Sequence, residues 1–448
     1  MQRRDFVKTS AILGAGAILS GCNTAKAASI NNDRIKVGLI GCGGRATGAA
    51  INMMCADQNI EFIAFADLFA DKIQPSVDRI SKEANKRFPK HAAKIINPAK
   101  VQKFSGWGCV DALLALKEVD VVIEATPPAF RTPHYAKIVA AGKHAFLEKP
   151  ACIDITQARQ MIKLAEEANK KGLSVVCGTQ RRYHEGYKEV IKRVHDGMIG
   201  EPLSAQCYWN GGYYVGQGQH DSMEKKGLFK GLTPDDMEYQ IRNWFSFIWA
   251  SGDHIVEQHV HNIDVIMWAL GDNRMPVEVR AMGGRDTDLA VPTYGDRFSH
   301  FAVDFDMGDG LRIESYCHQV PGVSDEVGER IVGTKGIMHT ALWGGPCKIT
   351  DHKGKVLYQA PDNVPQCLEM EHKYLLDNIR AGKQVNVLMP LLNSNLLAIA
   401  GRMSAFSGRK FKYDWMLKRS KEDLMPKQLA FVKNPIAGVP VPGKYKLV

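Results

Sequence analysis

The 448-residue sequence lacks several patterns that mark particular classes of protein. Its ten cysteines form no Cys-x-x-Cys pair, so the ligand spacing of a zinc finger is missing. No long run of like charges occurs, and no segment resembles a helix-turn-helix. No internal repeat or low-complexity block is present either. We therefore interpret the formal net charge of +10 as a basic surface and expect no nucleic-acid partner.

The first 28 residues predict an export signal. Residues 3–8 (RRDFVK) form a twin-arginine pattern, and the apolar run at 11–19 is too short to span a bilayer. Residues 19–22 (LSGC) are typical of a lipoprotein cleavage box, in which Cys22 becomes lipidated; cleavage after residues 25–27 (AKA) is the alternative. We expect a periplasmic protein exported by the twin-arginine route, with membrane contact only through a lipid on Cys22.

Short apolar strands alternate with helices between residues 34 and 181. This alternation predicts an α/β Rossmann domain with a doubly wound parallel sheet. Apolar residues make up 45% of the chain, which with this length allows a second domain with its own core. The expected strands are 35–40, 61–66, 119–125, 144–147 and 175–178, and the expected helices are 46–55, 70–88, 135–141 and 155–171.

Residues 182–448 have a different pattern. Segments with alternating apolar and polar residues predict an open, mostly antiparallel sheet with one solvent-exposed face. We expect this sheet to belong to an α+β domain for substrate binding and oligomerisation. The tail at 439–443 predicts an extended arm on the surface or on a neighbouring subunit. The expected strands are 277–281, 300–305, 311–317 and 330–332, and the expected helices are 369–381 and 393–407.

A glycine-rich turn at residues 41–46 (GCGGRA) follows the first strand and opens a helix. Gly41 permits the tight turn, Gly43 lets the backbone approach a pyrophosphate, and Ala46 lets the helix pack closely. Asp67 ends the second strand, where a carboxylate accepts both ribose hydroxyls and repels a 2′-phosphate. No arginine follows it, so NAD is favoured over NADP; a structural glycine turn or a flavin is the alternative. Gly44 and Arg45 complete the predicted phosphate turn.

Two further strand ends belong to the same predicted site. Thr126 and Pro127 follow the expected strand at 119–125, and residues 148–150 (EKP) follow the one at 144–147, at the edge where doubly wound sheets bind ligands. The predicted cofactor contacts here are Thr126, Pro127, His134, Glu148, Lys149 and Gln180.

Together, the glycine turn and the strand-end Glu148-Lys149-Pro150 resemble the glucose–fructose oxidoreductase / inositol dehydrogenase / MocA (Gfo/Idh/MocA) family over essentially the whole mature chain. The resemblance implies a saccharide substrate and a homo-oligomer, a dimer or tetramer formed through the open face of the second sheet.

Residues 251–264 hold the densest cluster of polar side chains. Glu257 and His261 are four residues apart, so a helix would place them on one face. The family carries Asp-x-x-x-His here, and Glu257 departs from it by one methylene. By resemblance, His261 is the acid/base, Lys149 polarises or helps to deprotonate the same hydroxyl, and Glu257 orients His261. A metal site with His254 and His259 is the alternative, but His259 would be rotated about 200° from His261 on a helix, so no metal is expected.

Arg182 and Tyr183 follow the last Rossmann strand and are predicted to contact substrate together with Lys149 and His261. Several aromatic residues are either sugar-stacking faces or core: Tyr208, Trp209, Tyr213, Tyr214, Tyr239 and Trp244.

The export signal bears on the chemistry, because no free NAD pool exists outside the cytoplasm. We expect tightly bound, recycled NAD and oxidation or reduction of a secondary hydroxyl of a sugar or glycoside, of the C3 type. An NAD-dependent glycoside hydrolase, working by oxidation, elimination, hydration and reduction, is the alternative. The family-109 glycosidases of this kind lack the Glu-Lys-Pro that this chain has. A non-catalytic sugar-binding protein is the third hypothesis.

Overall fold

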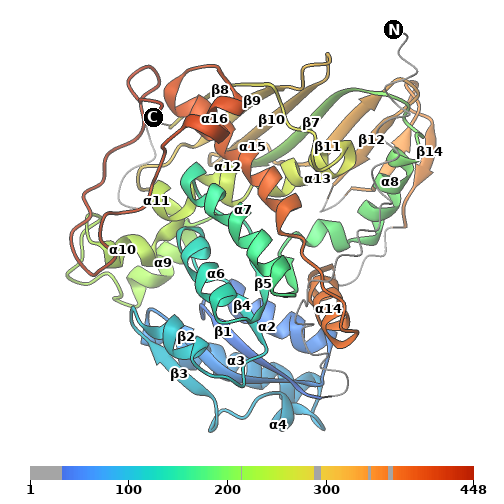
Figure 1. Ribbon diagram of the computed structural model, residues 1–448. Coiled ribbons are helices and arrows are strands. Elements are labelled where there is room, and N and C mark those ends of the chain that lie inside the picture. Colours follow the sequence, from blue (N-terminus) through green and yellow to red (C-terminus); the bar gives the residue numbers. More distant parts are fainter. Residues whose placement is uncertain (1–32, 213, 287–293, 342–344, 362–366) are drawn as a thin grey trace.

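The computed structural model describes residues 33–448 except 213, 287–293, 342–344 and 362–366 (Figure 1). The predicted signal at residues 1–28, its Cys22 and Tyr213 lie outside the described residues. Within the described part of the chain, no helix is both long enough and apolar enough to cross a membrane.

The first domain is built on a six-stranded parallel sheet in the order β3-β2-β1-β4-β5-β6. Apart from the polar, largely exposed edge strand β3, its strands are short and mostly apolar, as expected of a parallel sheet with helices on both faces. The strand order reverses between β1 and β4, where ligands of such sheets bind. The α/β Rossmann prediction is confirmed, although β3 was not anticipated. The strands are β1 (Ile35–Ile40), β2 (Ile60–Asp67), β3 (Gln102–Ser105), β4 (Val121–Glu124), β5 (His144–Leu147) and β6 (Val175–Cys177).

The helices of this domain connect its strands. In α7, the Asp154 side chain accepts a hydrogen bond from the Gln157 N–H at 2.8 Å and so caps the first turn. The helices are α2 (Gly44–Ala56), α3 (Ala70–Arg87), α4 (Ala92–Ile95), α5 (Cys109–Leu114), α6 (Arg131–Ala140) and α7 (Ile155–Lys170), with the 3₁₀ turns η1 (Pro128–Phe130) and η2 (Gln180–Tyr183).

The second domain contains a nine-stranded sheet in the order β14-β13-β12-β11-β7-β10-β9-β8-β15. Its pairs are antiparallel except β7 with β10, which agrees with the predicted open sheet. Sequence patterning anticipated neither the central β7 nor β12–β15. The strands are β7 (Pro202–Gly211), β8 (Glu278–Gly284), β9 (His300–Asp306), β10 (Arg312–Gln319), β11 (Glu326–Gly333), β12 (Ile337–Thr340), β13 (Lys348–Thr350), β14 (Val356–Gln359) and β15 (Phe411–Lys412).

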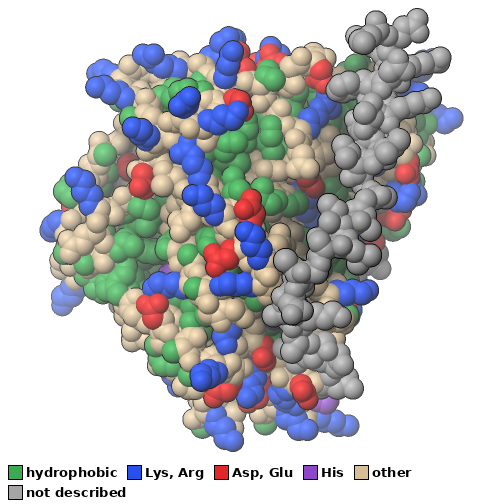
Figure 2. Space-filling view, viewed as in Figure 1, with side chains coloured by type: hydrophobic (Ala, Val, Ile, Leu, Met, Phe, Trp, Pro, Cys, Tyr) green, Lys and Arg blue, Asp and Glu red, His purple; other side chains and the backbone are tan. Residues whose placement is uncertain are grey.

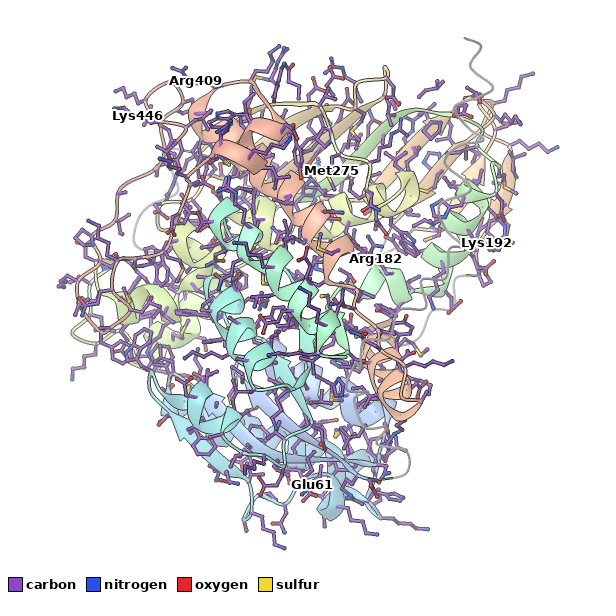
Figure 3. The ribbon with its side chains drawn as sticks, in the orientation of Figure 1. Glu61, Arg182, Lys192, Met275, Arg409 and Lys446 are labelled. Atoms are coloured by element: carbon purple, nitrogen blue, oxygen red, sulfur yellow. The ribbon has the colours of Figure 1, made fainter. Side chains whose placement is uncertain are left out.

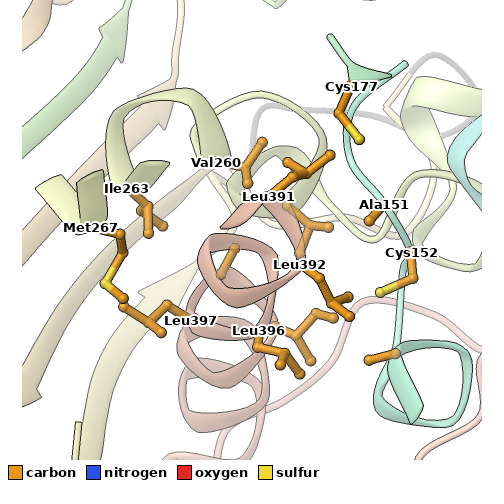
Figure 4. Packing of buried hydrophobic residues seen from close by; sticks show 14 of the residues in the cluster. Ala151, Cys152, Cys177, Val260, Ile263, Met267, Leu391, Leu392, Leu396 and Leu397 are labelled. Atoms are coloured by element: carbon orange, nitrogen blue, oxygen red, sulfur yellow. The ribbon is translucent and has the colours of Figure 1, made fainter. Parts of the chain in front are cut away.

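The helix α15 (Leu388–Ser407) lies between this sheet and the first domain, and it is buried on all sides from residue 391 onward. Figure 4 shows its leucines between α13 (Val260–Leu270) on one side and Ala151 and Cys152 on the other. Contact is close: a Cβ on Gly401 would lie 2.9 Å from the side chain of Val303. The two domains therefore share one continuous core.

Residues late in the chain return to the first domain. Helix α14 (Cys367–Arg380) packs against α2, and the Val175 N–H donates to the carbonyl of Val385 at 2.7 Å. The C-terminal tail crosses the surface of its own chain, where the Gly443 N–H donates to Ser407 at 2.9 Å. This agrees with the predicted arm on the surface.

Two of the remaining helices lie away from the first sheet: α8 (Glu185–His195) packs against β12 and α13, and α16 (Tyr413–Arg419) against β15 and α7. The others are α9 (Gln217–Lys225), α10 (Met237–Arg242), η3 (Trp244–Ser246), α11 (Ile248–Ser251) and α12 (His254–Glu257). On the face seen in Figure 2, Lys and Arg side chains are spread among Asp and Glu rather than gathered in one patch.

Candidate functional site

A cavity of about 1000 Å³ opens at the carboxyl edge of the first sheet. The glycine turn and the ends of β2, β4 and β5 form one wall. The second domain supplies the other, from β7, α9 and α12. Of the predicted site residues, Gly41, Gly43, Gly44, Arg45, Asp67, Thr126, Pro127, His134, Glu148, Lys149, Glu257 and His261 line the cavity.

The glycine turn is shaped for a dinucleotide. Gly41 has φ +88°, and a Cβ there would lie 2.9 Å from the carbonyl oxygen of Ala125. A Cβ on Gly43 or Gly44 would meet nothing within 4 Å, so both backbones face open space at the start of α2. The first N–H groups of a helix lack partners within it and favour anions. Ala46 is fully buried inside the same helix, which allows the close packing expected of it.

The carboxylate of Asp67 is fixed at the end of β2. Its oxygens accept hydrogen bonds from the backbone N–H of Cys42 at 2.7 Å and of Phe69 at 2.8 Å. Each oxygen keeps a further lone pair for a ribose hydroxyl. The residues present therefore fit the adenosine end of a dinucleotide.

Arg131 connects the turns that follow β4 and β5. Its guanidinium donates to Glu124 at 2.7 Å and to the carbonyls of Thr126 and Pro150, also at 2.7 Å. Burial alone would raise the pKa of Glu124, but Arg131, His134 and Thr126 outweigh it and lower the pKa to about 2. Sequence reasoning missed Arg131 and Glu124, although both flank the predicted strand end.

Arg45 forms an ion pair with Glu148 and lies 3.7 Å from the carboxylate of Glu371 in α14. Glu148 fills the space over Gly178, where a Cβ would lie 2.5 Å from its carboxylate. These contacts hold the wall of the cavity beside the glycine turn.

Lys149 and Glu257 meet across the cavity. The Lys149 Nζ donates to the main-chain carbonyl of Glu257 and lies 3.9 Å from its carboxylate. Burial lowers the pKa of Lys149, against the attraction of Glu257. Burial raises the pKa of Glu257 to about 7, against the attraction of Lys149 and Arg297. Burial thus favours the uncharged form of each group, while the attraction between them favours the charged forms.

His261 stands in the first turn of α13, and its ring packs on Trp209 with centroids 5.8 Å apart and planes 28° apart. Burial, followed by the charges of Lys149 and Arg181, lowers the pKa of His261 well below its ordinary value. An imidazole in this environment is neutral and can accept a proton.

The single helix expected across Glu257 and His261 is wrong. Helix α12 ends at Glu257, Gln258 has φ −118° and ψ −60°, and α13 begins at Val260. Among the described residues, no hydrogen bond joins Glu257 to His261. The orienting role predicted for Glu257 therefore lacks a direct contact, and the carboxylate faces Lys149 instead.

Arg182 and Tyr183 do not line the cavity, nor does Gln180 at the start of η2, so far as the structure describes it. The Arg182 guanidinium binds the carboxylate of Asp264 at 2.8 Å and that of Asp272 at 2.7 Å, and Figure 3 labels its position. Tyr183 packs against Tyr374, with ring centroids 5.7 Å apart. The predicted substrate contact of these two residues is not supported, because each side chain is occupied within the fold.

The aromatic candidates separate into two groups. Trp209 and Trp244 line the cavity, as does Phe245, which sequence reasoning missed. Tyr214 and Tyr239 are buried. Tyr208 stacks on Tyr316 with centroids 5.7 Å apart, outside the cavity lining.

The metal alternative is not supported by the geometry. Across the described residues, His254, Glu257, His259 and His261 do not form a group whose ligand atoms are close enough to share an ion. His259 is instead 2.7 Å from the hydroxyl of Ser315. A group of His220, Asp221 and Glu224 does meet the distance requirement, on α9.

The sequence profile of the Gfo/Idh/MocA family, described as an oxidoreductase family with an NAD-binding Rossmann fold, matches residues 35–176. A glycosyl hydrolase family 109 protein of Shewanella pealeana is 24% identical over 46% of this chain and 45% of its own length, so the chain matches less than half of that relative. The scyllo-inositol 2-dehydrogenase (NAD(+)) of Bacillus subtilis is 24% identical over 59% of this chain and 69% of its own.

The crystal structure of an aldose-aldose oxidoreductase from Caulobacter crescentus has the same fold. Its TM-score is 0.62 at 16% identity, over 85% of this chain and 99% of that one. The predicted cofactor, NAD, is confirmed by the family match. Residues 35–176 therefore match the NAD-binding Rossmann domain of the Gfo/Idh/MocA oxidoreductase family, and the sheet order and the glycine turn agree with that match.

Proposed function

We propose that this protein oxidises and reduces a secondary hydroxyl of a sugar or glycoside, using NAD that stays bound through the cycle. The observation that carries the proposal is the meeting of Lys149, Glu257 and His261 in the same cavity as the glycine turn and Asp67. When bound, NAD would supply the hydride acceptor for the carbinol carbon, and the glycine turn and Asp67 would hold it.

The residues of the chain handle the proton. A neutral His261 accepts the hydroxyl proton as the carbon loses its hydride. Lys149 donates a hydrogen bond to the same oxygen and stabilises the charge that develops on it. The Glu257 carboxyl, whose pKa burial raises to about 7, lies 3.9 Å from the Lys149 Nζ and would stabilise the ammonium when ionised. These three roles remain predictions.

The closure of the cavity at its adenosine end supports retention of the cofactor. Arg242 of α10 binds Asp71 at 3.1 Å and lies over the ring of Phe69, 3.8 Å from its centroid. Phe431 of the C-terminal tail packs on Phe69 and on Trp107, with centroids 5.9 and 5.4 Å away. Elements of the second domain thus contact the turn that follows Asp67, and these contacts would slow the release of a dinucleotide bound there.

Retention also fits the predicted location. A twin-arginine substrate crosses the membrane folded and carries its cofactor with it, and we propose a periplasmic lipoprotein anchored at Cys22. The polar open face of the second sheet, with the Tyr208–Tyr316 stack, is the surface that we propose for a homo-oligomer.

A net glycoside hydrolase is the second candidate, and the similarity to a family 109 glycosyl hydrolase favours it. There, oxidation at C3 acidifies the C2 proton, the C1 substituent leaves, water adds, and C3 is reduced by the hydride removed at the start. Lys149 and Glu257 would then remove the C2 proton.

Aryl glycosides separate the two candidates when they are incubated with the protein as isolated. Free phenol without net NADH supports hydrolysis. A 3-keto glycoside, formed with a second sugar carbonyl present as hydride acceptor, supports oxidation. A protein that yields neither product and releases no NAD(H) on denaturation contradicts the proposal.

A further inference from the structure

Trp209 contacts two charged or titratable side chains at the base of the cavity. Its indole packs on the ring of His261, at 5.8 Å between centroids, and the Arg181 guanidinium carbon lies 5.4 Å from the indole centroid. We propose that Trp209 is a positioning residue that fixes the plane of the His261 imidazole and, with Arg181, keeps it a neutral proton acceptor. This proposal rests on the acid/base role of His261 proposed above.

The strand that carries Trp209 is rigid. It pairs with Cys317 of β10 and with Val327 of β11, so both edges of β7 are hydrogen-bonded at this position. A side chain on a central strand holds its direction better than one on a loop. The indole therefore gives the imidazole a fixed surface.

His261 has little else to fix its ring. Among the described residues, no hydrogen bond is found for either ring nitrogen, and the side chain is 8% exposed, at the cavity. A base at a reaction centre must hold its orientation, since a displacement of about 1 Å can reduce the rate about 100-fold. Stacking on Trp209 supplies that restraint and leaves the nitrogens available for a substrate hydroxyl.

Arg181 is held at the indole by a buried network. It is 1% exposed and binds Glu329 at 2.5 Å, while Asn262 at 2.7 Å and Thr340 at 2.5 Å donate to the same carboxylate. The guanidinium charge therefore cannot turn away toward solvent.

After burial, the groups that most strongly lower the pKa of His261 are Lys149 after β5, Arg181 in η2, Arg45 in α2 and His259 just before α13. Their charges disfavour the imidazolium. The Glu257 carboxylate lies 3.9 Å from the Lys149 Nζ.

The competing role for Trp209 is a stacking face for the sugar ring. A stacking face lost by mutation raises KM with little change in kcat, whereas a lost positioning residue lowers kcat.

The test compares Trp209→Leu and Trp209→Phe with Trp268→Leu in the NAD-loaded protein. Trp268 is a matched control because it also lies under an arginine, with the Arg182 carbon 5.5 Å from its ring, away from the cavity. We expect Trp209→Leu to lower kcat about 10- to 100-fold. Trp209→Phe keeps a ring on His261 and should restore most of the rate, and Trp268→Leu should leave the pH profile unchanged.

Nitrogen-15 NMR of histidine-labelled protein, assigned with His261→Gln, reads the protonation of His261 without turnover. In Trp209→Leu the pKa of His261 should rise toward its ordinary value by roughly one unit. The acid limb of the pH profile of kcat should shift to higher pH by a similar amount. An unchanged His261 titration, or a rise in KM alone, overturns the proposal. If His261→Ala keeps full activity while Trp209→Leu still moves the titration, the proposed function has failed and the positioning has not.

Discussion

The Lys149 ammonium donates to the main-chain carbonyl of Glu257 and lies 3.9 Å from its carboxylate. The contact joins the end of β5 in the first domain to the end of α12 in the second, across the cavity. Where the two domains meet, burial favours the uncharged form of each group and their mutual attraction favours the charged forms. The predictions below follow from this contact and from the cofactor cradle beside it.

Replacing Glu257 by Gln should stabilise the protein at high pH. Burial raises the pKa of Glu257 to about 7 in the folded protein, above its value in the unfolded chain. Folding therefore binds the proton more tightly, and the unfolding free energy falls as pH rises through this interval. Glutamine has no proton to lose, so Glu257→Gln should be more stable than wild type by about 3 kcal/mol at pH 8 and show no such gain at about pH 4.

Urea unfolding of both proteins across this pH range measures the effect. Glu83→Gln is the control, because a hydrogen bond from Arg87 lowers the pKa of Glu83, and its substitution should act with the opposite sign. A gain in stability for Glu257→Gln that is independent of pH would contradict a buried Glu257 carboxyl with a raised pKa.

Replacing Lys149 by Met should abolish most turnover while leaving the cofactor bound. The proposed polarisation of the substrate oxygen needs the ammonium, and loss of such a group lowers kcat/KM about 10²- to 10⁴-fold. Steady-state rates and the NAD(H) content after denaturation measure the two effects separately. Lys143→Met is the control, since Lys143 is half-buried just before β5, at the opposite end of that strand from Lys149, and donates to the Lys117 carbonyl at 3.0 Å. Wild-type rates in Lys149→Met would exclude the assigned role.

The parts of the fold and site that could be predicted are those coded by neighbouring residues. The turn at Gly41, the acid Asp67 at the next strand end and the strand-end Lys149 are local signals, and the structure brings them to one cavity with His261. Strand β7 was missed because its inward residues, such as Ala205 and Cys207, are small and give a weak alternation.

Other features depend on partners far along the chain. Arg182 follows β6 and was predicted to contact substrate. Its guanidinium instead binds Asp264 and Asp272, which are 82 and 90 residues away. The Arg181–Glu329 pair spans 148 residues and gives no local pattern. The break at Gln258 also escaped prediction, because the apolar residues around it continue a helical spacing.

Replacing Asp67 by Asn should weaken NAD binding. The carboxylate oxygens already accept the N–H groups of Cys42 and Phe69, and an amide would oppose one of these donors with its own NH₂. Loss of hydrogen bonds to a charged group costs about 1.5–3 kcal/mol, so NAD affinity should fall about 10- to 100-fold. Calorimetry on protein stripped of cofactor measures it, with the exposed Asp78→Asn as control. An unchanged affinity of Asp67→Asn for NAD would show that the ribose does not bind at Asp67.

Opening the closure over the adenosine end should convert retained NAD into exchangeable NAD. Arg242→Ala removes the ion pair with Asp71 and the contact with Phe69, and Phe431→Ala removes the ring that packs on Phe69 and Trp107. Such contacts contribute about 0.5–2 kcal/mol each, so NAD release should accelerate roughly 2- to 30-fold in each variant and further in the double variant.

Displacement of bound NAD by an isotopically labelled form gives the release rate directly. Arg312→Ala is the matched control, because Arg312 pairs with Asp304 at 2.7 Å on the exposed face of the second sheet, away from the cavity. Release that is equally slow in wild type, in both single variants, in the double variant and in Arg312→Ala would show that the second domain does not retain the cofactor. Faster release with unchanged single-turnover rates would separate retention from catalysis, since the closure lies at the adenosine end and the reacting groups lie at Lys149 and His261.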